Sequence, residues 1–260
     1  MSWGRLSLLP LLVVAVTALV YVLQPNEVPA PPSPPVPEIT PPTPDFASIS
    51  DTAQKKAAFF NFMRLHVRAA NDRVLADRER LARLRRQLAT PAALGDEDEA
   101  WLAAQAARYR AKGASPSEVA DALWRHMDII PASLALAQAA KESAWGSSRF
   151  ARSGNNYFGI WCFTANCGDV PLDRDEGKTH EVARYDSVTD NVSIYLLTLN
   201  RHEAYTRLRD IRANLRESGA PVTGTALVPG LLNYSERREA YVEEVNEMIV
   251  TNDLARFDRR

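Results

Sequence analysis

The 260-residue sequence has few of the residues that define disulfide-rich or metal-centred proteins. Its two cysteines exclude a multi-disulfide scaffold and a four-cysteine zinc site. Its four histidines form neither an HExxH nor an HxH motif, so we expect no histidine-based metal centre. Its eleven glycines show no collagen period and no phosphate-binding loop. We therefore expect neither a metal nor a cofactor.

An excess of positive charge is also missing. The chain has 31 Lys and Arg against 32 Asp and Glu, a formal net charge of −1. Because affinity for phosphate backbones needs a basic surplus, we expect no nucleic-acid partner. Hydrophobic residues make up 46% and charged residues 24%, which is typical of a folded protein. Removing residues 1–45 from 260 leaves 215, enough for one large domain or for a domain with a helical appendage.

A long apolar run occupies residues 6–23, LSLLPLLVVAVTALVYVL. Its 18 residues would span about 27 Å as a helix, close to the roughly 30 Å of a bilayer core. Arg5 precedes the run and the next Lys or Arg is Lys55, so the positive-inside rule predicts export of the chain beyond residue 24. We predict a signal anchor over 1–24, a single pass of the inner membrane and a periplasmic domain. The alternative is a signal peptide cleaved near Val16-Thr17-Ala18, which would give a secreted protein.

Residues 25–45 contain ten of the 17 prolines. Such a segment cannot pack a core and favours extended polyproline II. We interpret it as a linker between the membrane and the folded part.

Residues 46–127 are predicted to form a helical region. The pattern over 52–89 indicates one or two amphipathic helices with ten Lys or Arg and three acidic residues. This stretch either contacts anionic lipid or wall polymer, or it forms a solvated face with Asp–Arg pairs, and we favour the second. Two further helices are predicted, one from a capping box at Asp96 to Lys112 and one starting at Ser115.

The remaining sequence predicts helices around a small β lobe. A helix is expected from about 132 to 145, with Gly146 ending it. Short aromatic and β-branched runs punctuated by Gly, Asn, Asp and Pro indicate a β-hairpin lobe over 150–186. Helical patterns return after Ser187 and continue over 203–217, 224–232 and 236–250. The predicted fold class is α+β, mostly α, with the ligand site between the helical and β parts.

The alanine-rich helix contains the most informative carboxylate. Gln138 and Glu142 are four residues apart and so share a face, and Trp145 lies three residues further on. The carbonyl end of a helix and burial both oppose ionisation, so both raise the pKa of Glu142. A raised pKa suits a general acid that works near neutral pH. The alternative is an ordinary surface glutamate beside Lys141.

Four ordered motifs resemble the glucosaminidase family, glycoside hydrolase family 73, and in particular its Bax-like branch. They are Ala140-Lys141-Glu142-Ser143-Ala144-Trp145-Gly146, Asn156-Tyr157-Phe158-Gly159-Ile160, Tyr185-Asp186-Ser187 and Tyr234-Ser235-Glu236-Arg237. The resemblance implies a lysozyme-like catalytic domain over 128–254. It also implies hydrolysis of β-1,4 bonds of N-acetylglucosamine in peptidoglycan glycan strands.

The resemblance also implies roles for individual residues. Glu142 matches the family's general acid, which protonates the leaving glycosidic oxygen. The second family acid falls among Asp173, Asp175, Glu176 and Glu181, and we choose Glu181; assistance by the substrate's N-acetyl group is the alternative. Tyr234 matches a groove tyrosine, with a core tyrosine as the other interpretation. The residues expected to bind substrate are Gln138, Trp145, Asn156, Tyr157, Phe158 and Trp161, with a position in the core as the favoured alternative for Phe158.

Cys162 and Cys167 are separated by four residues within the predicted β lobe. In an exported protein this spacing predicts a disulfide that fixes the hairpin, rather than two free thiols. Two rival functions fit the same residues. One is a lytic transglycosylase on the same fold, and the other is a catalytically inactive wall-binding or assembly protein.

Overall fold

The computed structural model describes residues 42–171, 174 and 177–258. The predicted anchor over 6–23 and nearly all of the proline-rich linker lie outside these residues. Within the described residues, no helix combines the length and the apolar character needed to cross a bilayer.

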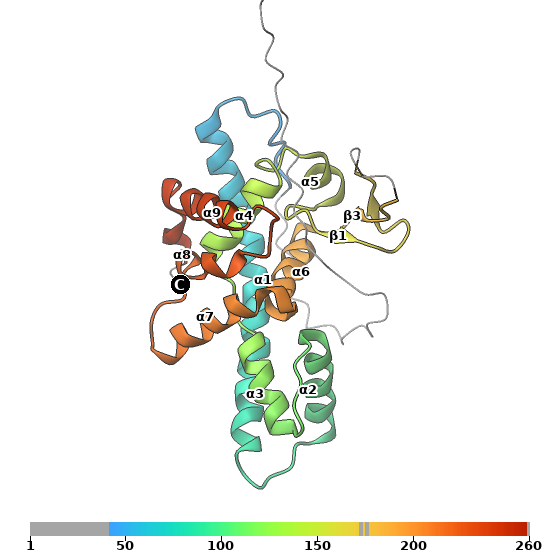
Figure 1. Cartoon of the computed structure of the whole chain (residues 1–260), viewed down its shortest axis with the longest axis vertical. Helices are drawn as coiled ribbons and strands as arrows, with labels where there is room; N and C mark the ends of the chain where they lie inside the picture. The colour runs from blue at the N-terminus through green and yellow to red at the C-terminus, as the bar shows by residue number, and fades with distance from the viewer. Residues whose placement is uncertain (1–41, 172–173, 175–176, 259–260) are drawn as a thin grey trace, which may run out of the picture.

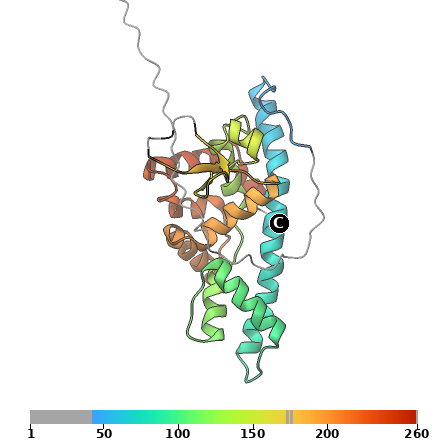
Figure 2. The same cartoon turned by 90° about the vertical axis from the view of Figure 1, so that its right-hand side faces the viewer.

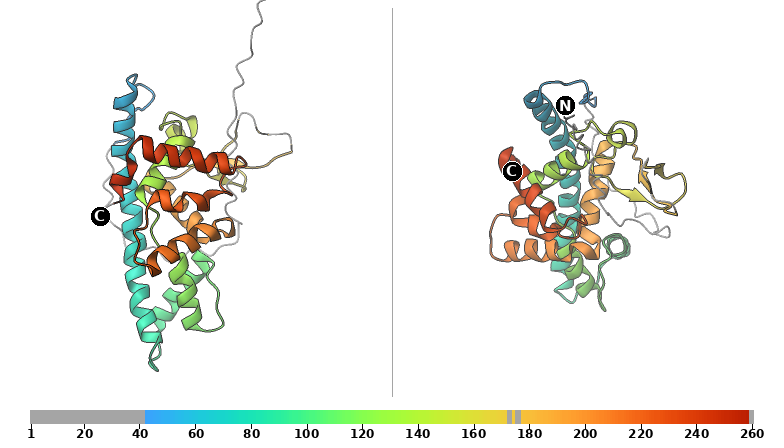
Figure 3. Two further views of the ribbon diagram at one scale, coloured as in Figure 1. Left: turned by 60° about the vertical axis from the view of Figure 1, so that its left-hand side comes forward. Right: turned by 45° about the horizontal axis from the view of Figure 1, so that its top comes forward.

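A single long helix, α1 (Thr52–Leu88), forms one side of the molecule (Figure 2). Asp51 caps its first turn by accepting a 2.7 Å hydrogen bond from the backbone N–H of Gln54. The other helices pack along one flank of α1 (Figures 2 and 3). Helix α1 contacts α3, α4 and α6, so the predicted helical region is packed directly against the predicted catalytic domain. Its buried side chains include Phe59, Phe60, Met63, Val67, Leu81 and Leu84.

Helices α2 (Asp96–Tyr109) and α3 (Pro116–His126) cover the far end of α1 (Figure 1). The predicted capping box at Asp96 is wrong, because Gly95 is the N-cap and no side chain caps the helix. The predicted end at Lys112 is also wrong, because Arg110 adopts a left-handed conformation with φ 55° and stops the helix. Ser115 caps α3 as predicted.

Several cations of α1 pair with these two helices. Arg80 contacts Asp98 at 2.7 Å, and Arg85 contacts Asp121 at 2.6 Å. The Arg78 guanidinium lies 3.5 Å from the centre of the Trp124 ring. These cations of α1 therefore form Asp–Arg pairs and cation–π contacts, in agreement with the interpretation favoured from the sequence.

The remaining helices surround the alanine-rich helix α4. A buried ion pair holds their centre: Asp128 accepts hydrogen bonds from Arg216 at 3.0 and 3.1 Å, and the buried Arg212 lies 3.9 Å from the same carboxylate. Ser187 caps α6 as predicted. The bounds of these elements are α4 (Ala132–Glu142), α5 (Arg149–Gly154), α6 (Val188–Arg201), η1 (Glu203–Tyr205), α7 (Thr206–Glu217), α8 (Gly224–Leu227), η2 (Val228–Leu231), α9 (Glu239–Thr251) and η3 (Leu254–Phe257).

The β lobe lies to one side of the helices (Figure 1). Within the described residues it has three short antiparallel strands, β1 (Trp161–Cys162), β2 (Gly168–Asp169) and β3 (Glu181–Ala183), in the order β1-β3-β2. Cys162 pairs with Glu181 across β1 and β3. The predicted disulfide between Cys162 and Cys167 is present. A mostly helical α+β fold with a small β lobe is thus confirmed, and α5 is a helix that the sequence pattern did not indicate.

Candidate active site

The alanine-rich sequence of α4 places its last residue beside the core. Small side chains let neighbouring helices approach closely, and residues 133–140 are all buried. Asp258 lies at the start of the helix, where its carboxylate accepts hydrogen bonds from the N–H and hydroxyl of Ser133 at 2.8 and 2.6 Å. A carboxylate at this position stabilises the positive end of the helix. These contacts fix the start of α4, and the turn after Glu142 fixes its end.

Helix α4 ends at Glu142, three residues before the predicted end at Trp145. Ala144, Trp145 and Gly146 all have positive φ angles. Ser143 holds this turn together, because its hydroxyl donates to the carbonyl of Ala139 at 2.6 Å and accepts from the N–H of Gly146 at 2.8 Å. The turn exposes the Glu142 carboxylate at a helix end instead of within a continuous helix.

The Glu142 carboxylate is only partly accessible to solvent. Burial raises its pKa to about 7, while the hydrogen bond from Tyr241 and the charge of Lys141 act in the opposite direction. The Tyr241 hydroxyl donates to Glu142 Oε1 at 2.8 Å. Near neutral pH a substantial fraction of Glu142 is protonated, as the sequence predicted.

A chain of hydrogen bonds leads from the core to this carboxylate. The Tyr195 hydroxyl donates to Gln138 Oε1 at 2.6 Å, and Gln138 Nε2 donates to the Tyr241 hydroxyl at 2.9 Å. Because the Tyr241 oxygen accepts from Gln138, its own proton is directed to Glu142. All three supporting side chains are buried. The chain therefore holds Oε1 of Glu142 and leaves Oε2 outside this series of hydrogen bonds.

Charged residues surround the outer side of Glu142. Lys141 forms an ion pair with Glu244 of α9, and Arg237 pairs with the same carboxylate. The two cations lower the pKa of Glu244, so Glu244 stays ionised. Its negative charge acts on Glu142 in the direction of a higher pKa.

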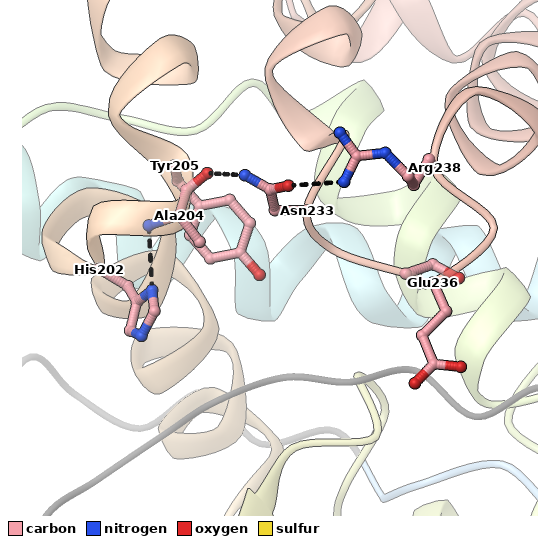
Figure 4. A pocket seen from close by; sticks show the side chains of 7 residues that line it. His202, Ala204, Tyr205, Asn233, Glu236 and Arg238 are labelled. Carbon is pink, nitrogen blue, oxygen red and sulfur yellow. Dashed lines mark hydrogen bonds between the residues drawn. The ribbon is translucent and has the colours of Figure 1, made fainter.

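Stacked tyrosines connect Glu142 to an open pocket. The Tyr234 ring stacks on Tyr241 with centroids 5.3 Å apart and planes at 9°, and Tyr205 lies 6.2 Å from Tyr234. The pocket, which we call the tyrosine pocket, has a volume of about 420 Å³ (Figure 4). Its lining residues are His202, Ala204, Tyr205, Asn233, Ser235, Glu236 and Arg238.

Two tyrosines of this cluster differ in what their hydroxyls do. The Tyr234 hydroxyl, expected to meet substrate, is buried and donates to the carbonyl of Phe158 at 3.2 Å. The Tyr205 hydroxyl makes no hydrogen bond with any described residue, and its ring lines the tyrosine pocket. Burial and the charge of Glu142 both raise the pKa of Tyr205, so it stays protonated as a donor. Tyr205 is not among the site residues expected from the sequence, because no motif marks a tyrosine between two helices.

Most of the residues expected to bind substrate are buried in the core. Tyr157 and Phe158 are 1% and 0% exposed, and the Phe158 ring stacks on Tyr195 at 3.9 Å. Asn156 is buried and donates to the carbonyls of Ile160 and Ala183 at 2.8 and 2.9 Å. Like Gln138, these residues are therefore part of the buried core around the candidate site.

Two tryptophans are only half-buried. Trp161 stacks on His180 in the β lobe, with ring centroids 4.0 Å apart. Trp145 packs edge-on against Phe59 and Phe60 of α1. Both residues are therefore partly accessible to solvent.

Glu181 is held by the loop that the disulfide closes. Its two oxygens accept hydrogen bonds from the backbone N–H groups of Gly168 at 2.8 Å and Asn166 at 3.1 Å. These bonds lower the pKa of Glu181, so it is ionised at neutral pH. The neighbouring sulfurs of Cys162 and Cys167 are joined in the disulfide, so this group is not a set of metal ligands. The other candidates, Asp173, Asp175 and Glu176, lie outside the described residues.

Comparison with known proteins identifies the family of the chain. Residues 117–254 match the glucosaminidase family, described as mannosyl-glycoprotein endo-beta-N-acetylglucosaminidase. This chain belongs to the glucosaminidase family. The Protein bax of Escherichia coli (strain K12) is 32% identical over 200 residues, which cover 76% of this chain and 70% of that relative. No solved structure matches the chain significantly.

Proposed function

We propose that this protein is a peptidoglycan hydrolase, an endo-β-N-acetylglucosaminidase with Glu142 as its general acid. Family membership supports glycosidase chemistry on peptidoglycan. The observation that carries the residue assignment is the partly buried Glu142 carboxyl, with a pKa raised to about 7 and one oxygen held by Tyr241. A general acid for glycosidic cleavage must be protonated in the resting enzyme and must give up that proton as the bond breaks.

In the proposed first step, Glu142 Oε2 donates its proton to the leaving glycosidic oxygen as the C1–O bond breaks. The bonding electrons leave with that oxygen, and positive charge develops at C1. The Tyr241 hydrogen bond stabilises the carboxylate that remains. Because Gln138 and Tyr195 are already arranged behind Tyr241, this stabilisation needs no rearrangement.

For the second step we propose Glu181 as the anionic partner. Its lowered pKa keeps it negative at the pH where Glu142 is protonated, so the two carboxyls are suited to different roles. Glu181 would activate the attacking water or stabilise the positive charge, with the substrate's N-acetyl group as the alternative nucleophile. Tyr205 would donate its hydroxyl, which bonds to no described residue, to the substrate at the tyrosine pocket.

The decisive experiment incubates the full chain with purified peptidoglycan and identifies the new ends by mass spectrometry. Reducing-end N-acetylglucosamine is expected, and the Glu142→Gln variant should release none while binding the polymer normally. Anhydro-muramyl ends would replace the hydrolase with a lytic transglycosylase. Binding without any cleavage would favour the inactive wall-binding protein.

We also propose an inner-membrane anchor with the catalytic part in the periplasm. The support is the apolar run over 6–23, flanked by Arg5 and followed by the proline-rich linker. The test is N-terminal sequencing of the mature protein together with carbonate extraction of membranes. A mature chain that starts near Leu19 would instead mean a secreted enzyme.

A further inference from the structure

Several polar side chains of the tyrosine pocket are already bound within the protein. Asn233 Nδ2 donates to the carbonyl of Ala204 at 3.2 Å, and Asn233 Oδ1 accepts from Arg238 Nη1 at 3.2 Å. His202 Nδ1 accepts from the backbone N–H of Ala204 at 3.2 Å. These hydrogen bonds, which Figure 4 shows as dashed lines, connect the two segments that form the pocket. They give the pocket a fixed wall.

Two other lining side chains differ from these. Neither the Tyr205 hydroxyl nor the Glu236 carboxylate makes a hydrogen bond or an ion pair with any residue that the structure describes. In Figure 4 the Glu236 carboxylate is turned away from Arg238, whose guanidinium points to Asn233. A phenolic hydroxyl can donate a hydrogen bond, whereas a carboxylate accepts one. The pocket therefore offers one donor and one acceptor to a ligand.

The backbone around Glu236 is held on both sides. Ser235 is buried, and its hydroxyl accepts from the N–H of Arg237 at 3.3 Å. Arg237 in turn donates to Glu244 at 3.0 Å. Arg238 has φ 46° and ψ −109°, a conformation that a non-glycine residue keeps only where the surrounding contacts impose it. The loop thus has little backbone freedom to lose when Glu236 binds a ligand.

The tyrosine pocket adjoins the candidate acid. The Tyr205 ring lies 6.2 Å from Tyr234, Tyr234 stacks on Tyr241, and Tyr241 donates to Glu142. The charge of Glu142 also acts on the pKa of Tyr205, as expected for groups that lie close together. A polymer with a glycosidic oxygen at Glu142 therefore brings the substituents of a neighbouring sugar to this pocket. Its volume of about 420 Å³ is ordinary for a small-molecule site.

An amide group has the chemistry that this pair of side chains can bind. It presents an N–H donor and a carbonyl acceptor on separate atoms of one planar group. In an acetamido group the carbonyl also carries a methyl, for which Ala204 and the Tyr205 ring provide apolar surface. A sugar hydroxyl offers its donor and its acceptor on a single oxygen and has no methyl. The lining therefore favours an acetamido group over a hydroxyl.

We propose that the tyrosine pocket recognises the acetamido group of a sugar on the bound strand. The Tyr205 hydroxyl donates to the acetamido carbonyl, the Glu236 carboxylate accepts from its N–H, and the methyl packs on Ala204. This proposal rests on the proposed function, because it names the feature by which that site selects its polymer. Binding of unsubstituted sugar hydroxyls by the same pair is the competing outcome of the test.

The test measures the binding of two soluble trisaccharides to the full chain by calorimetry, with Glu142→Gln in every protein to prevent cleavage. Tri-N-acetylchitotriose carries acetamido groups where cellotriose carries hydroxyls. Tyr205→Phe should weaken binding of the acetylated trimer about three- to tenfold, and Glu236→Ala should weaken it about tenfold. Neither change should alter the affinity for cellotriose. Urea midpoints should also stay the same, because neither polar group bonds to a described residue.

Two matched controls lie outside the pocket. Glu247→Ala removes an exposed carboxylate of α9, and Tyr109→Phe removes the hydroxyl of a buried tyrosine of α2. Both should bind the two trimers as the parent protein does. An equal loss on both trimers in Tyr205→Phe and Glu236→Ala would assign the pair to sugar hydroxyls and overturn the proposal. Unchanged affinities, or a parent protein that does not prefer the acetylated trimer, would overturn it as well.

Cleavage by the same variants with Glu142 restored separates this proposal from the proposed function. Glu236→Ala should then raise KM more than it lowers kcat. A fall in kcat with unchanged affinity would make Glu236 a catalytic carboxylate and overturn its binding role. If the trimers bind as expected but the protein cleaves no peptidoglycan, the proposed function fails and the specificity of the pocket stands.

Discussion

The Tyr241 hydroxyl donates a 2.8 Å hydrogen bond to Glu142 Oε1, although the two residues are 99 positions apart in the sequence. The acid at the end of α4 is thus held by α9, the last long helix of the domain. The same hydroxyl accepts from Gln138, one turn before Glu142. This contact orients the Tyr241 proton toward Glu142 and opposes the rise in the Glu142 pKa that burial causes.

The first prediction concerns the pH dependence of cleavage. A hydrogen bond that stabilises the carboxylate lowers its pKa, so Tyr241→Phe should raise the pKa of Glu142 above its value of about 7. In the proposed mechanism activity depends on the protonated form, so the alkaline limb of the pH–rate profile should move to higher pH. The maximal rate should fall about 10- to 100-fold, because the carboxylate formed in the reaction loses a donor. The measurement is kcat/KM against pH.

Tyr109→Phe is the matched control, because Tyr109 is a buried tyrosine of α2 far from this network. Its alkaline limb should coincide with that of the unmodified protein. An unshifted limb in Tyr241→Phe would show that the hydrogen bond does not control Glu142.

The second prediction concerns stability. The pKa of Glu142 is about 7 in the folded protein against an ordinary value of 4.5, so ionisation opposes folding. The stability of the native protein is therefore highest below pH 4.5 with respect to this group and declines as the pH rises through 7. Glu142→Gln has no such titration. Relative to the unmodified protein, it should gain up to about 3 kcal/mol in unfolding free energy between pH 4 and pH 8.

Urea unfolding of both proteins at the two pH values measures this difference. Glu99→Gln, an exposed acid in the first turn of α2, controls for the general loss of a carboxylate. If the difference between Glu142→Gln and the unmodified protein does not change with pH, the raised pKa is refuted.

The sequence singles out Glu142 but does not indicate the tyrosines that hold it. Glu142 stands out because its helix is rich in alanine and ends at a glycine turn, both of which are local features. Tyr195 and Tyr241 reach Gln138 only after α6 and α9 pack against α4, which no local pattern encodes. The end of α2 is likewise not marked by a local pattern, because Arg110, which is not a glycine, ends the helix in a left-handed conformation.

The sequence also could not separate groove aromatics from core aromatics. Phe158 and Trp161 lie in one short motif, yet Phe158 is fully buried and Trp161 is half-exposed. The difference comes from the turn at Gly159, whose φ is +64°, and from the short strand β1 beyond it. Without the tertiary structure, both residues are simply apolar rings near an expected site.

The third prediction concerns the disulfide. Replacing Cys162 and Cys167 by Ser frees the loop whose backbone N–H groups hold Glu181. The pKa of Glu181 should then rise toward its ordinary value, so activity that needs the anion is lost at higher pH than before. Loss of a link across five positions should also cost about 2 kcal/mol of stability. The acid limb of the pH–rate profile and urea midpoints measure the two effects.

Dithiothreitol applied to the unmodified protein should reproduce the shift of the acid limb, and it should have no effect on the double Ser variant. An acid limb that stays in place in both cases would separate the disulfide from catalysis and leave it a stabilising link alone.

The fourth prediction concerns the turn after Glu142. Gly146 has φ +74°, and a Cβ there would lie 2.3 Å from the ring of the buried Phe46. Gly146→Ala must therefore strain the backbone and also displace Phe46 from Phe59 and Phe62, to which it packs edge-on. We expect a loss of about 2–4 kcal/mol, the sum of a left-handed alanine and an overpacked core.

Gly219→Ala separates these two costs. Gly219 has a similar φ of +69°, but nothing lies within 4 Å of the added Cβ, so only the backbone cost of about 1 kcal/mol applies. Urea midpoints of the two variants give the difference directly. Equal losses would mean that Phe46 moves freely and that the segment before α1 does not fix the turn. A larger loss at Gly146 together with a lower kcat would show that this packing holds Glu142 in place, because the turn begins at the residue directly after the acid.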